Sequence, residues 1–272
     1  MARAKTNAFN KFFDKIYVIS LFDQPEKWKK VEKQFNRRGI KAERFVAVDG
    51  RCKKQGIQGC KDKLRSFETS YNVSISNDSG YPLKELIPAA SLTIGTILIL
   101  REMVKNKWER VLICEDDIEL AKNLETKFKQ VVKELGDTSY DLLYLSCGNQ
   151  CGIHNLGSKK TKRIKYESML NEHYDLGLWV ADERDLRIEC DGCKPISKHI
   201  TKVVRPGGTW FYSYSLKGAR KLLKMLDNDA GNHIDQIIKD FTEAGKLKCL
   251  AVDPPIGWHQ KGREGSSMEW QW

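Results

Sequence analysis

The sequence predicts an α/β fold in which a mixed, mainly parallel sheet is flanked by helices. Short apolar runs rich in Val, Ile, Leu and Tyr alternate with longer segments of helical periodicity, as strands and helices do in such folds. The chain opens with a strand–helix–strand pattern, which is typical of a right-handed parallel βαβ unit. Its 272 residues, 40% of them hydrophobic and 31% charged, can bury a full core.

In the first half of the chain, apolar runs predict strands and apolar residues at helical spacing predict helices. Asp23 is the expected N-cap of the first helix, Pro25 lies in its first turn and Gly39 ends it. The sequence predicts, in order, a loose basic arm over 1–12, a domain that starts at 13, a strand at 16–21, a helix from Asp23 to Gly39, a strand at 44–48, a loop or small insertion at about 51–88, an apolar helix at 89–105 and a strand at 111–114.

In the second half of the chain, apolar runs and helical spacing again predict the strands and helices. Apolar residues from Leu120 to Leu135 lie at helical spacing, Gly136 ends that helix, and Ser215 is the expected cap of another. The polar stretch 147–205 has neither a helical nor a strand period and is predicted to be an insertion. The remaining predictions are strands at 142–146, 209–214 and 247–252, helices after Ser215 and from Asn232, the end of the domain at 255 and a C-terminal tail at 256–272.

Three consecutive acids, Glu115, Asp116 and Asp117, follow the strand at 111–114. Open α/β sheets bind ligands at the carboxyl ends of their strands, so these side chains are candidates for a site. Hard carboxylate oxygens suit Mg²⁺ or Mn²⁺, which commonly bridge protein carboxylates to substrate phosphates. The alternative is that the acids begin a helix, where the helix dipole favours them. The acids alone leave both interpretations open.

Lysine and arginine outnumber aspartate and glutamate, which gives a net charge of +11. This charge favours solubility and attracts anionic nucleotide sugars, acidic membrane surfaces or nucleic acid. The sequence contains no nucleic-acid-binding motif, so nucleic acid is not an expected partner, whereas peripheral membrane association stays open. No stretch approaches the ~20 apolar residues that span a bilayer and no signal peptide is recognisable, so a cytoplasmic location is expected.

The chain has eight cysteines. Cys114 and Cys249 lie within apolar strand-like runs and are expected to be small core residues. The pairs Cys147-x3-Cys151 and Cys190-x2-Cys193 leave three alternatives open, which are a zinc site, disulfides and free thiols. Without a signal peptide, reduced thiols are the default expectation.

Five segments occur in a fixed order, namely IYVISL with QFNRRGIKAERFVAVDG, then REMVKNKWERVLICEDDIEL, YSLKGARKLL, HIDQII and HQKGREG. In this order and spacing they resemble glycosyltransferase family 25, the group that contains lipooligosaccharide and collagen galactosyltransferases. The resemblance covers most of residues 15–269. It implies a nucleotide-binding half-Rossmann fold of the GT-A type and transfer of a sugar with inversion at its anomeric carbon.

The resemblance gives the acids specific roles. A nucleoside diphosphate leaving group develops negative charge, which a carboxylate-bound cation can stabilise. Asp117 and Glu115 lie on the same side of an extended chain and are the expected ligands of Mn²⁺ or Mg²⁺, with His259 from a tail that closes over the site. Asp116 points the other way and is expected to contact the donor ribose or to cap the next helix. The other expected donor-binding residues, all near the opening strand, are Ser20, Leu21 and Asp49.

Asp235 is the expected general base, because it falls where the family carries an acid and because inversion needs one base that faces the acceptor hydroxyl. The alternative is a structural role, since Asn232 and Asp235 have capping-box-like spacing. Aromatic faces suit sugar rings, so the expected acceptor-binding residues are Trp210, Tyr212 and Tyr214.

The predicted function is that of a metal-dependent, inverting glycosyltransferase, which moves a hexose (galactose or glucose) from a UDP-sugar to a glycan, glycolipid or hydroxylated protein. Two positions depart from the family pattern: Lys27 replaces an Arg, and Gly95-Thr96 replaces a Ser-His pair. These departures leave open a catalytically inactive UDP- or sugar-binding protein on the same fold. A basic RNA- or membrane-associated interaction protein is a third alternative.

Overall fold

The computed structural model describes residues 7–52, 56–78, 80–146, 193–253 and 255–259. Its strands are β1 (Lys15–Ser20), β2 (Glu43–Val46), β3 (Arg110–Glu115), β4 (Ile118–Leu120), β5 (Leu142–Ser146), β6 (Lys194–Pro195), β7 (Ile200–Val203), β8 (Phe211–Ser215), β9 (Cys249–Val252) and β10 (Gly257–His259). Its helices are α1 (Ala8–Phe12), α2 (Pro25–Asn36), α3 (Gly56–Tyr71), α4 (Leu83–Asn106), α5 (Leu124–Leu135), α7 (Leu216–Leu226) and α8 (Ile234–Glu243).

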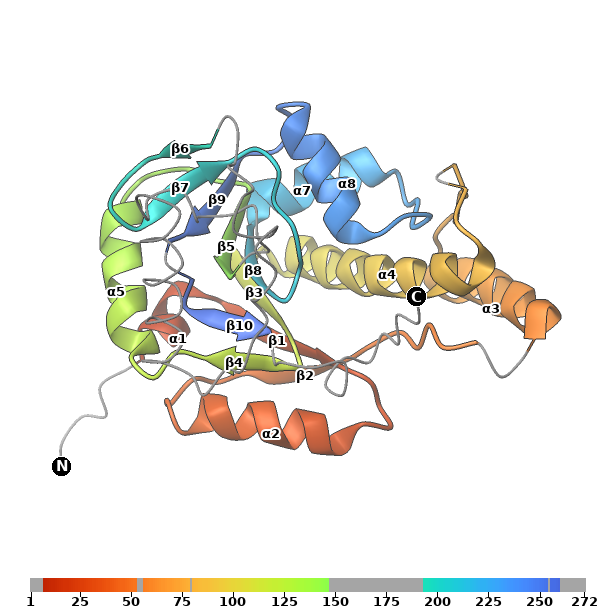
Figure 1. The fold of residues 1–272 in the computed structure, drawn as a ribbon, viewed down its shortest axis with the longest axis horizontal. Helices are drawn as coiled ribbons and strands as arrows, with labels where there is room; N and C mark the ends of the chain where they lie inside the picture. Colours follow the sequence, from red (N-terminus) through yellow and green to blue (C-terminus); the bar gives the residue numbers. More distant parts are fainter. Residues whose placement is uncertain (1–6, 53–55, 79, 147–192, 254, 260–272) are drawn as a thin grey trace, which may run out of the picture.

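The predicted α/β class, with a mixed sheet flanked by helices, is confirmed. In the described residues, one eight-stranded sheet has the order β2-β1-β3-β8-β5-β9-β7-β6, and β10 pairs separately with β4. The opening βαβ unit is parallel, since β1 pairs in parallel with both β2 and β3, whereas β8 runs antiparallel between β3 and β5. Figure 1 shows α5 at one side of this sheet and α4, α7 and α8 at the other.

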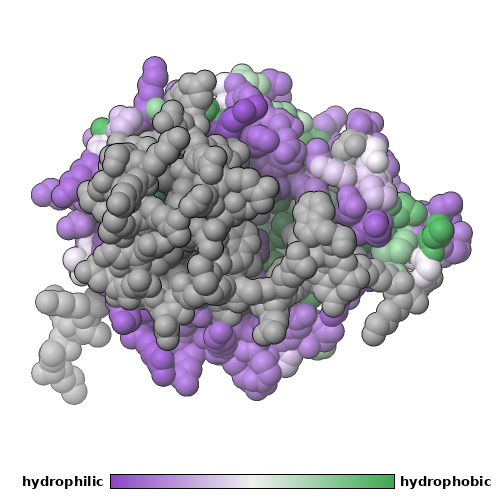
Figure 2. Space-filling view, viewed as in Figure 1, coloured by the Kyte–Doolittle hydropathy of each residue, from purple (hydrophilic) through white to green (hydrophobic). Residues whose placement is uncertain are grey.

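The central strands β1, β3, β5, β8 and β9 are buried on both faces, which explains why their sequences are continuous apolar runs. Tyr17 and Ile19 of β1 pack into a core formed with α3, α4, α7 and α8. Ile16 and Val18 point the other way, into a second core formed with α1, α2 and α5. The outer surface of α2, at the bottom of the view in Figure 2, is hydrophilic, as its Lys- and Glu-rich sequence requires.

The stretch at about 51–88, predicted as a loop or small insertion, is not an irregular loop. Residues from Gly56 to Tyr71 form α3, which buries Cys60 and Phe67, seven residues apart on one face, and packs on α4. The remaining α3 side chains are mostly polar, so the apolar stripe is too sparse to recognise without its partner helix. α4 also begins earlier than predicted, at Leu83, and continues through Pro88.

The prediction that no stretch is apolar and long enough to approach a membrane span is also wrong, because of α4. Its 24 residues are long and apolar enough, by length and composition, to cross a membrane. However, 67% of its most apolar window is buried inside the protein, against α3, α7 and α8. Burial in the protein core therefore explains why α4 is long and apolar.

The N-terminal segment is more ordered than predicted from residue 8 onward. α1 packs on α5, and the Phe9 ring stacks on Phe128 with 3.9 Å between centroids. The predicted cap of α2 is also wrong, because Gln24 is the N-cap residue and Asp23 instead forms an ion pair with Arg51 at 2.8 Å.

The segment after the three acids is a strand, not a helix. β4 follows at once and pairs with β10, and α5 begins only at Leu124. Gly136 ends α5 with a φ of 46°, as predicted. The interpretation of the acids as a helix start is therefore wrong, and so is the predicted capping role of Asp116.

Two further elements lie inside the predicted insertion at 147–205. β6 and β7 form a hairpin that joins the edge of the main sheet through β9. The Ser215 cap of α7 is confirmed, because the Ser215 hydroxyl oxygen accepts a hydrogen bond from the Gly218 N–H at 3.0 Å.

The cysteines divide into two groups. Cys114 and Cys249 are free and fully buried, as predicted. Cys52 and Cys60 form a disulfide, contrary to the expectation of reduced thiols, and this bond ties the chain after β2 to the start of α3. Cys193 is disulfide-bonded as well. The predictions for the other cysteines fall outside the described residues, at Cys147, Cys151 and Cys190.

A polar cluster fixes the chain at the end of β9. The Glu134 carboxylate of α5 accepts hydrogen bonds from the Ser197 hydroxyl and from the His199 backbone N–H (2.8 Å). The His199 carbonyl accepts from the Asp253 N–H at 3.0 Å. Burial raises the pKa of the Asp253 carboxyl to about 6, and the nearby His199 opposes this rise.

Asp253→Asn should stabilise the protein at pH 8 but much less at pH 4.5. The folded-state pKa lies above the ordinary value of 3.8, so the folded protein binds the proton more tightly and loses stability as pH rises from about 4 to 6. One pKa unit corresponds to about 1.4 kcal/mol, so removal of the buried charge should add roughly 1–3 kcal/mol above pH 6. Urea unfolding of both proteins at the two pH values measures this difference. An equal difference at both would contradict the buried charge.

Candidate functional site

The three acids lie where two parallel strands end side by side. Ile19 of β1 is opposite Glu115 of β3, so the chain that leaves β1 at Ser20 runs next to Asp116. Asp116 and Asp117 form the turn between β3 and β4 and are only 7% and 4% exposed. We refer to Glu115, Asp116 and Asp117 as the acid turn.

The acid turn contains a costly buried charge. Burial raises the pKa of Asp116 and the adjacent Asp117 adds to this effect, while a hydrogen bond from the Ser20 hydroxyl and the positive charges of Lys27 and Arg44 oppose it. The Asp116 Oδ2 atom is buried and has no hydrogen-bond partner among the described residues. A buried carboxylate oxygen needs a cation or a hydrogen-bond donor to offset its lost hydration. Two buried carboxylates in one turn therefore fit a divalent cation and the polar groups of a ligand.

The C-terminal segment reaches the acid turn through its backbone. β10 pairs antiparallel with β4, which places His259 opposite Ile118, the residue after Asp117. The His259 side chain lies outside the part of the chain that the structure describes. Within that part, no group of three or more His, Cys, Asp or Glu side chains is arranged to hold a metal ion. The assignment of Asp117, Glu115 and His259 as metal ligands therefore stays a prediction.

The predicted donor-binding residues near β1 separate into two environments. Ser20 is 2% exposed and donates to Asp116, and the carbonyl of the adjacent Leu21 accepts from the Arg44 guanidinium at 2.5 Å. Asp49 instead accepts hydrogen bonds from the Arg51 backbone N–H (2.9 Å) and Nε (2.8 Å), which hold its pKa below the ordinary value. Ser20 and Leu21 therefore lie at the acid turn, whereas Asp49 belongs to an ion pair.

Asp235 lies half-buried in the first turn of α8, and its Oδ1 atom accepts from the Gln236 N–H at 2.9 Å. The N-cap is His233, whose own backbone N–H donates to the Asn232 side chain, so the capping box considered for Asn232 and Asp235 is absent. The Thr93 hydroxyl donates to the Asn232 carbonyl at 2.7 Å, which anchors the start of α8 on α4. The position of Asp235 is thus fixed by the core and not by a cap.

Tyr212 connects Asp235 to the acid turn. Burial raises the pKa of the Tyr212 hydroxyl, a hydrogen bond with Thr96 opposes the rise, and the negative charges of Glu115 and Asp235 both increase it. Both carboxylates therefore lie close enough to one hydroxyl to act on it. The fold brings together residues of β3 and α8 that are distant in the sequence, with Thr96, one of the departures from the family pattern, beside them.

The prediction of an aromatic acceptor surface needs correction. Tyr212 and Tyr214 are 1% and 0% exposed and pack edge to face, with ring centroids 5.4 Å apart. β8 lies between β3 and β5 with core packed on both faces, so its side chains are buried on both sides and have no face to offer a sugar. Trp210 is half-buried, donates from Nε1 to the Ser146 hydroxyl oxygen (2.8 Å), and stays a candidate.

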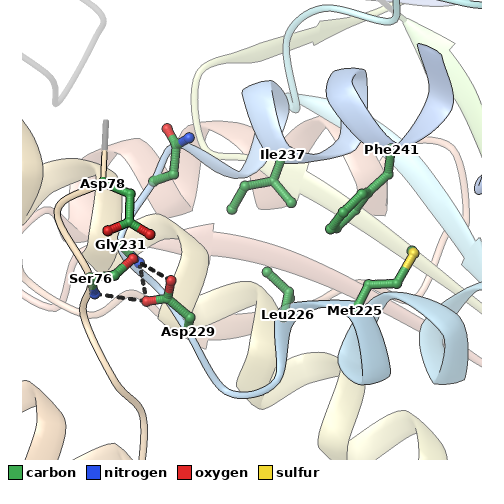
Figure 3. A pocket seen from close by; sticks show the side chains of 9 residues that line it. Ser76, Asp78, Met225, Leu226, Asp229, Gly231, Ile237 and Phe241 are labelled. Carbon is green, nitrogen blue, oxygen red and sulfur yellow. Dashed lines mark hydrogen bonds between the residues drawn. The ribbon is translucent and has the colours of Figure 1, made fainter. Parts of the chain in front are cut away.

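A cavity of about 190 Å³ lies between α7, α8 and the loop before α4. In Figure 3, Ile237 and Phe241 of α8 lie across from the C-terminal end of α7, where Met225 and Leu226 line the cavity. The polar side chains of Ser76, Asp78 and Asp229 lie at the other end. Asn232, three residues before Asp235, also lines the cavity, whereas none of the three acids does. This cavity was not predictable from the sequence, because long-range contacts between the loop before α4 and residues 229–231 create it. Gly231 completes its lining.

Comparison with known proteins agrees with the resemblance found in the sequence. The family described as "Glycosyltransferase family 25 (LPS biosynthesis protein)" matches residues 13–238. A Drosophila melanogaster protein named "Glycosyltransferase 25 family member" is 29% identical over 259 residues, which is 88% of this chain and 34% of that protein. The chain therefore spans about a third of the length of this relative.

Among solved structures, apo mouse xyloside xylosyltransferase 1 is similar to 85% of this chain and 69% of its own, at 10% identity. Its TM-score is 0.34, which is too low for any conclusion about mechanism.

Proposed function

Because the chain belongs to glycosyltransferase family 25, we propose that it transfers a hexose from a UDP-sugar to a hydroxyl group of a glycan, glycolipid or hydroxylated protein. We also propose that transfer depends on Mn²⁺ or Mg²⁺ and inverts the anomeric carbon. The donor hexose is galactose or glucose, as in the family members that the sequence resembles.

The observation that supports this proposal most is the pair of buried carboxylates in the acid turn, at the carboxyl ends of β1 and β3. Ligands of open α/β sheets bind at this edge. Asp116 has a buried oxygen with no hydrogen-bond partner in the described part of the chain, which a ligand group or cation would satisfy. Asp117 and Glu115, with His259 from β10, would hold the cation, which would supply positive charge for the leaving diphosphate.

Asp235 supplies the second half of the proposed chemistry. It takes the proton of the acceptor hydroxyl while that oxygen forms a bond to the anomeric carbon of the donor sugar. The bond from that carbon to the diphosphate oxygen breaks at the same time, and UDP leaves with the bonding electron pair. The charges of Asp235 and of Glu115 in the acid turn both act on the buried Tyr212 hydroxyl, which supports a role for both carboxylates in one reaction.

A panel of UDP-sugars tests the donor class. The protein is mixed with Mn²⁺ and each UDP-sugar, with and without glycan and hydroxylated peptide acceptors, and release of UDP is measured. Acceptor-dependent release from UDP-galactose or UDP-glucose, lost on addition of EDTA, is the expected result. NMR of the product during the first turnovers determines whether the anomeric configuration inverts.

The second candidate function is binding of UDP or a sugar without catalysis. The observation behind it is Thr96, which replaces a family His, hydrogen bonds to Tyr212 and donates to the Leu92 carbonyl at 3.1 Å. UDP binding without turnover on any acceptor of the panel would favour this function.

The predicted cytoplasmic location stays a prediction, and the Cys52–Cys60 disulfide is more typical of an oxidising compartment.

A further inference from the structure

Arg44 fixes the chain where β1 ends. It lies on β2, opposite Val18 of β1. Its Nη2 atom donates to the carbonyls of Leu21 (2.5 Å) and Phe22 (3.2 Å) and lies 3.5 Å from the Ser20 hydroxyl oxygen. One guanidinium thus contacts three consecutive residues, so it sets the direction of the backbone as it leaves the sheet.

These contacts continue to the acid turn. The Ser20 hydroxyl is hydrogen-bonded to the Asp116 carboxylate, and the pairing of β1 with β3 keeps the two residues side by side. Ser20 and Asp116 are 2% and 7% exposed, so water has little access to compete for this hydrogen bond. A continuous series of contacts therefore runs from Arg44 through Ser20 to Asp116.

Arginine suits this position. Its longer side chain carries Nη2 from β2 to the Leu21 and Phe22 carbonyls, and its charge is spread over a planar group that is less strongly hydrated than a lysine ammonium. Arg44 is half-buried and its Nε atom is fully buried, with no hydrogen-bond partner among the described residues. Loss of the guanidinium would leave the carbonyls of Leu21 and Phe22 without this donor, and the end of β1 would relax.

We infer that Arg44 is a positioning residue of the donor site, which holds residues 20–22 so that Ser20 keeps Asp116 in the orientation that meets the sugar nucleotide. This inference rests on the proposed function, which assigns the acid turn to UDP-sugar binding. Arg44 acts through Ser20 and the end of β1 and does not contact the reacting atoms.

The test compares Arg44→Lys with a matched control, Arg101→Lys. Arg101 of α4 also donates to two consecutive carbonyls, those of Tyr71 (2.7 Å) and Asn72 (2.8 Å), but it does so at the end of α3. Both substitutions keep the positive charge but replace the guanidinium with a shorter side chain that ends in a single ammonium group. Calorimetry with UDP and MnCl₂ measures affinity, steady-state kinetics separate the donor KM from kcat, and thermal unfolding reports stability.

Arg44→Lys should weaken UDP affinity and raise the donor KM by about tenfold, which corresponds to the loss of one hydrogen bond to a charged group. The values of kcat and acceptor KM should change less than threefold, because binding of the donor is weakened equally in the ground and transition states. Arg101→Lys should keep the wild-type donor KM even if it lowers the melting temperature as much as Arg44→Lys does. This split separates positioning from general destabilisation.

Ser20→Ala is the second variant, because it removes the link between Arg44 and Asp116 with little change in packing, and it should also raise the donor KM. UDP affinities of Arg44→Lys and Ser20→Ala within twofold of the wild type would overturn the inference while leaving the proposed function intact. If the wild-type protein itself does not bind UDP with Mn²⁺, both the proposed function and the role of Arg44 are overturned.

Discussion

Asp117→Ala should abolish sugar transfer and weaken UDP binding while leaving the protein folded. Asp117 is 4% exposed in the turn after β3, and with Glu115 it is our proposed ligand for the cation that offsets the charge of the leaving diphosphate. Loss of such electrostatic stabilisation lowers kcat by about 10²–10³-fold. The measurements are acceptor-dependent UDP release and calorimetric UDP affinity, each with Mn²⁺ and with EDTA.

The stability of Asp117→Ala provides an internal control. Asp116 and Asp117 are adjacent and both buried, and their mutual repulsion contributes to the raised pKa of Asp116. Removal of one charge should therefore keep or slightly raise the melting temperature at pH 7. The matched control is Asp137→Ala, which removes an exposed carboxylate just after α5 and should behave as wild type. A wild-type UDP affinity that neither EDTA nor Asp117→Ala changes would remove Asp117 from the metal site.

Asp235→Asn should lower transfer to the acceptor by about 10²–10⁴-fold, the usual contribution of a general base. The substitution keeps the size of the side chain and the oxygen that accepts from the Gln236 N–H, but an amide cannot take a proton. UDP-sugar affinity and melting temperature should therefore stay near the wild-type values. Single-turnover transfer kinetics, with saturating donor, measure the chemical step directly.

The matched control for Asp235 lies on the same helix. Asp240 is exposed and accepts a hydrogen bond from the Gln236 side chain, so Asp240→Asn makes the same chemical change on α8 outside the site. This variant should transfer sugar at the wild-type rate. If Asp235→Asn is equally active, then Asp235 serves only to favour the helix N-terminus, where either side chain is accepted.

Most strands and the acid turn could be predicted from the sequence because their signals are local. A strand buried on both faces, such as β3 or β5, must be a continuous apolar run, and each was predicted within a residue or two. The three acids directly after β3 marked the ligand-binding edge for the same reason. The burial of Tyr212 and Tyr214 was not predictable, because a strand with an aromatic run looks the same whether its second face meets solvent or core.

Helices with few apolar residues, and contacts between segments distant in the chain, could not be predicted from neighbouring residues. α3 buries few apolar residues and is recognisable only once α4 covers them. β4 is three residues long and depends on β10 for its hydrogen bonds, so a helix was the better local prediction. Neither the Cys52–Cys60 disulfide nor the role of Arg44 has a signature in the spacing of residues.

The sequence by itself determined the α/β class, the order of the main strands and the position of the three acids, because hydrophobic period and strand ends are properties of neighbouring residues. Only the tertiary structure decided what surrounds these acids. It brought Ser20, Lys27 and Arg44 to Asp116, and it let the charges of Asp235 and Glu115 both act on the Tyr212 hydroxyl. The physical reason is that burial and charge interaction depend on distance in space, which the packing of β1, β3, β8 and α8 sets and which spacing along the chain does not reveal.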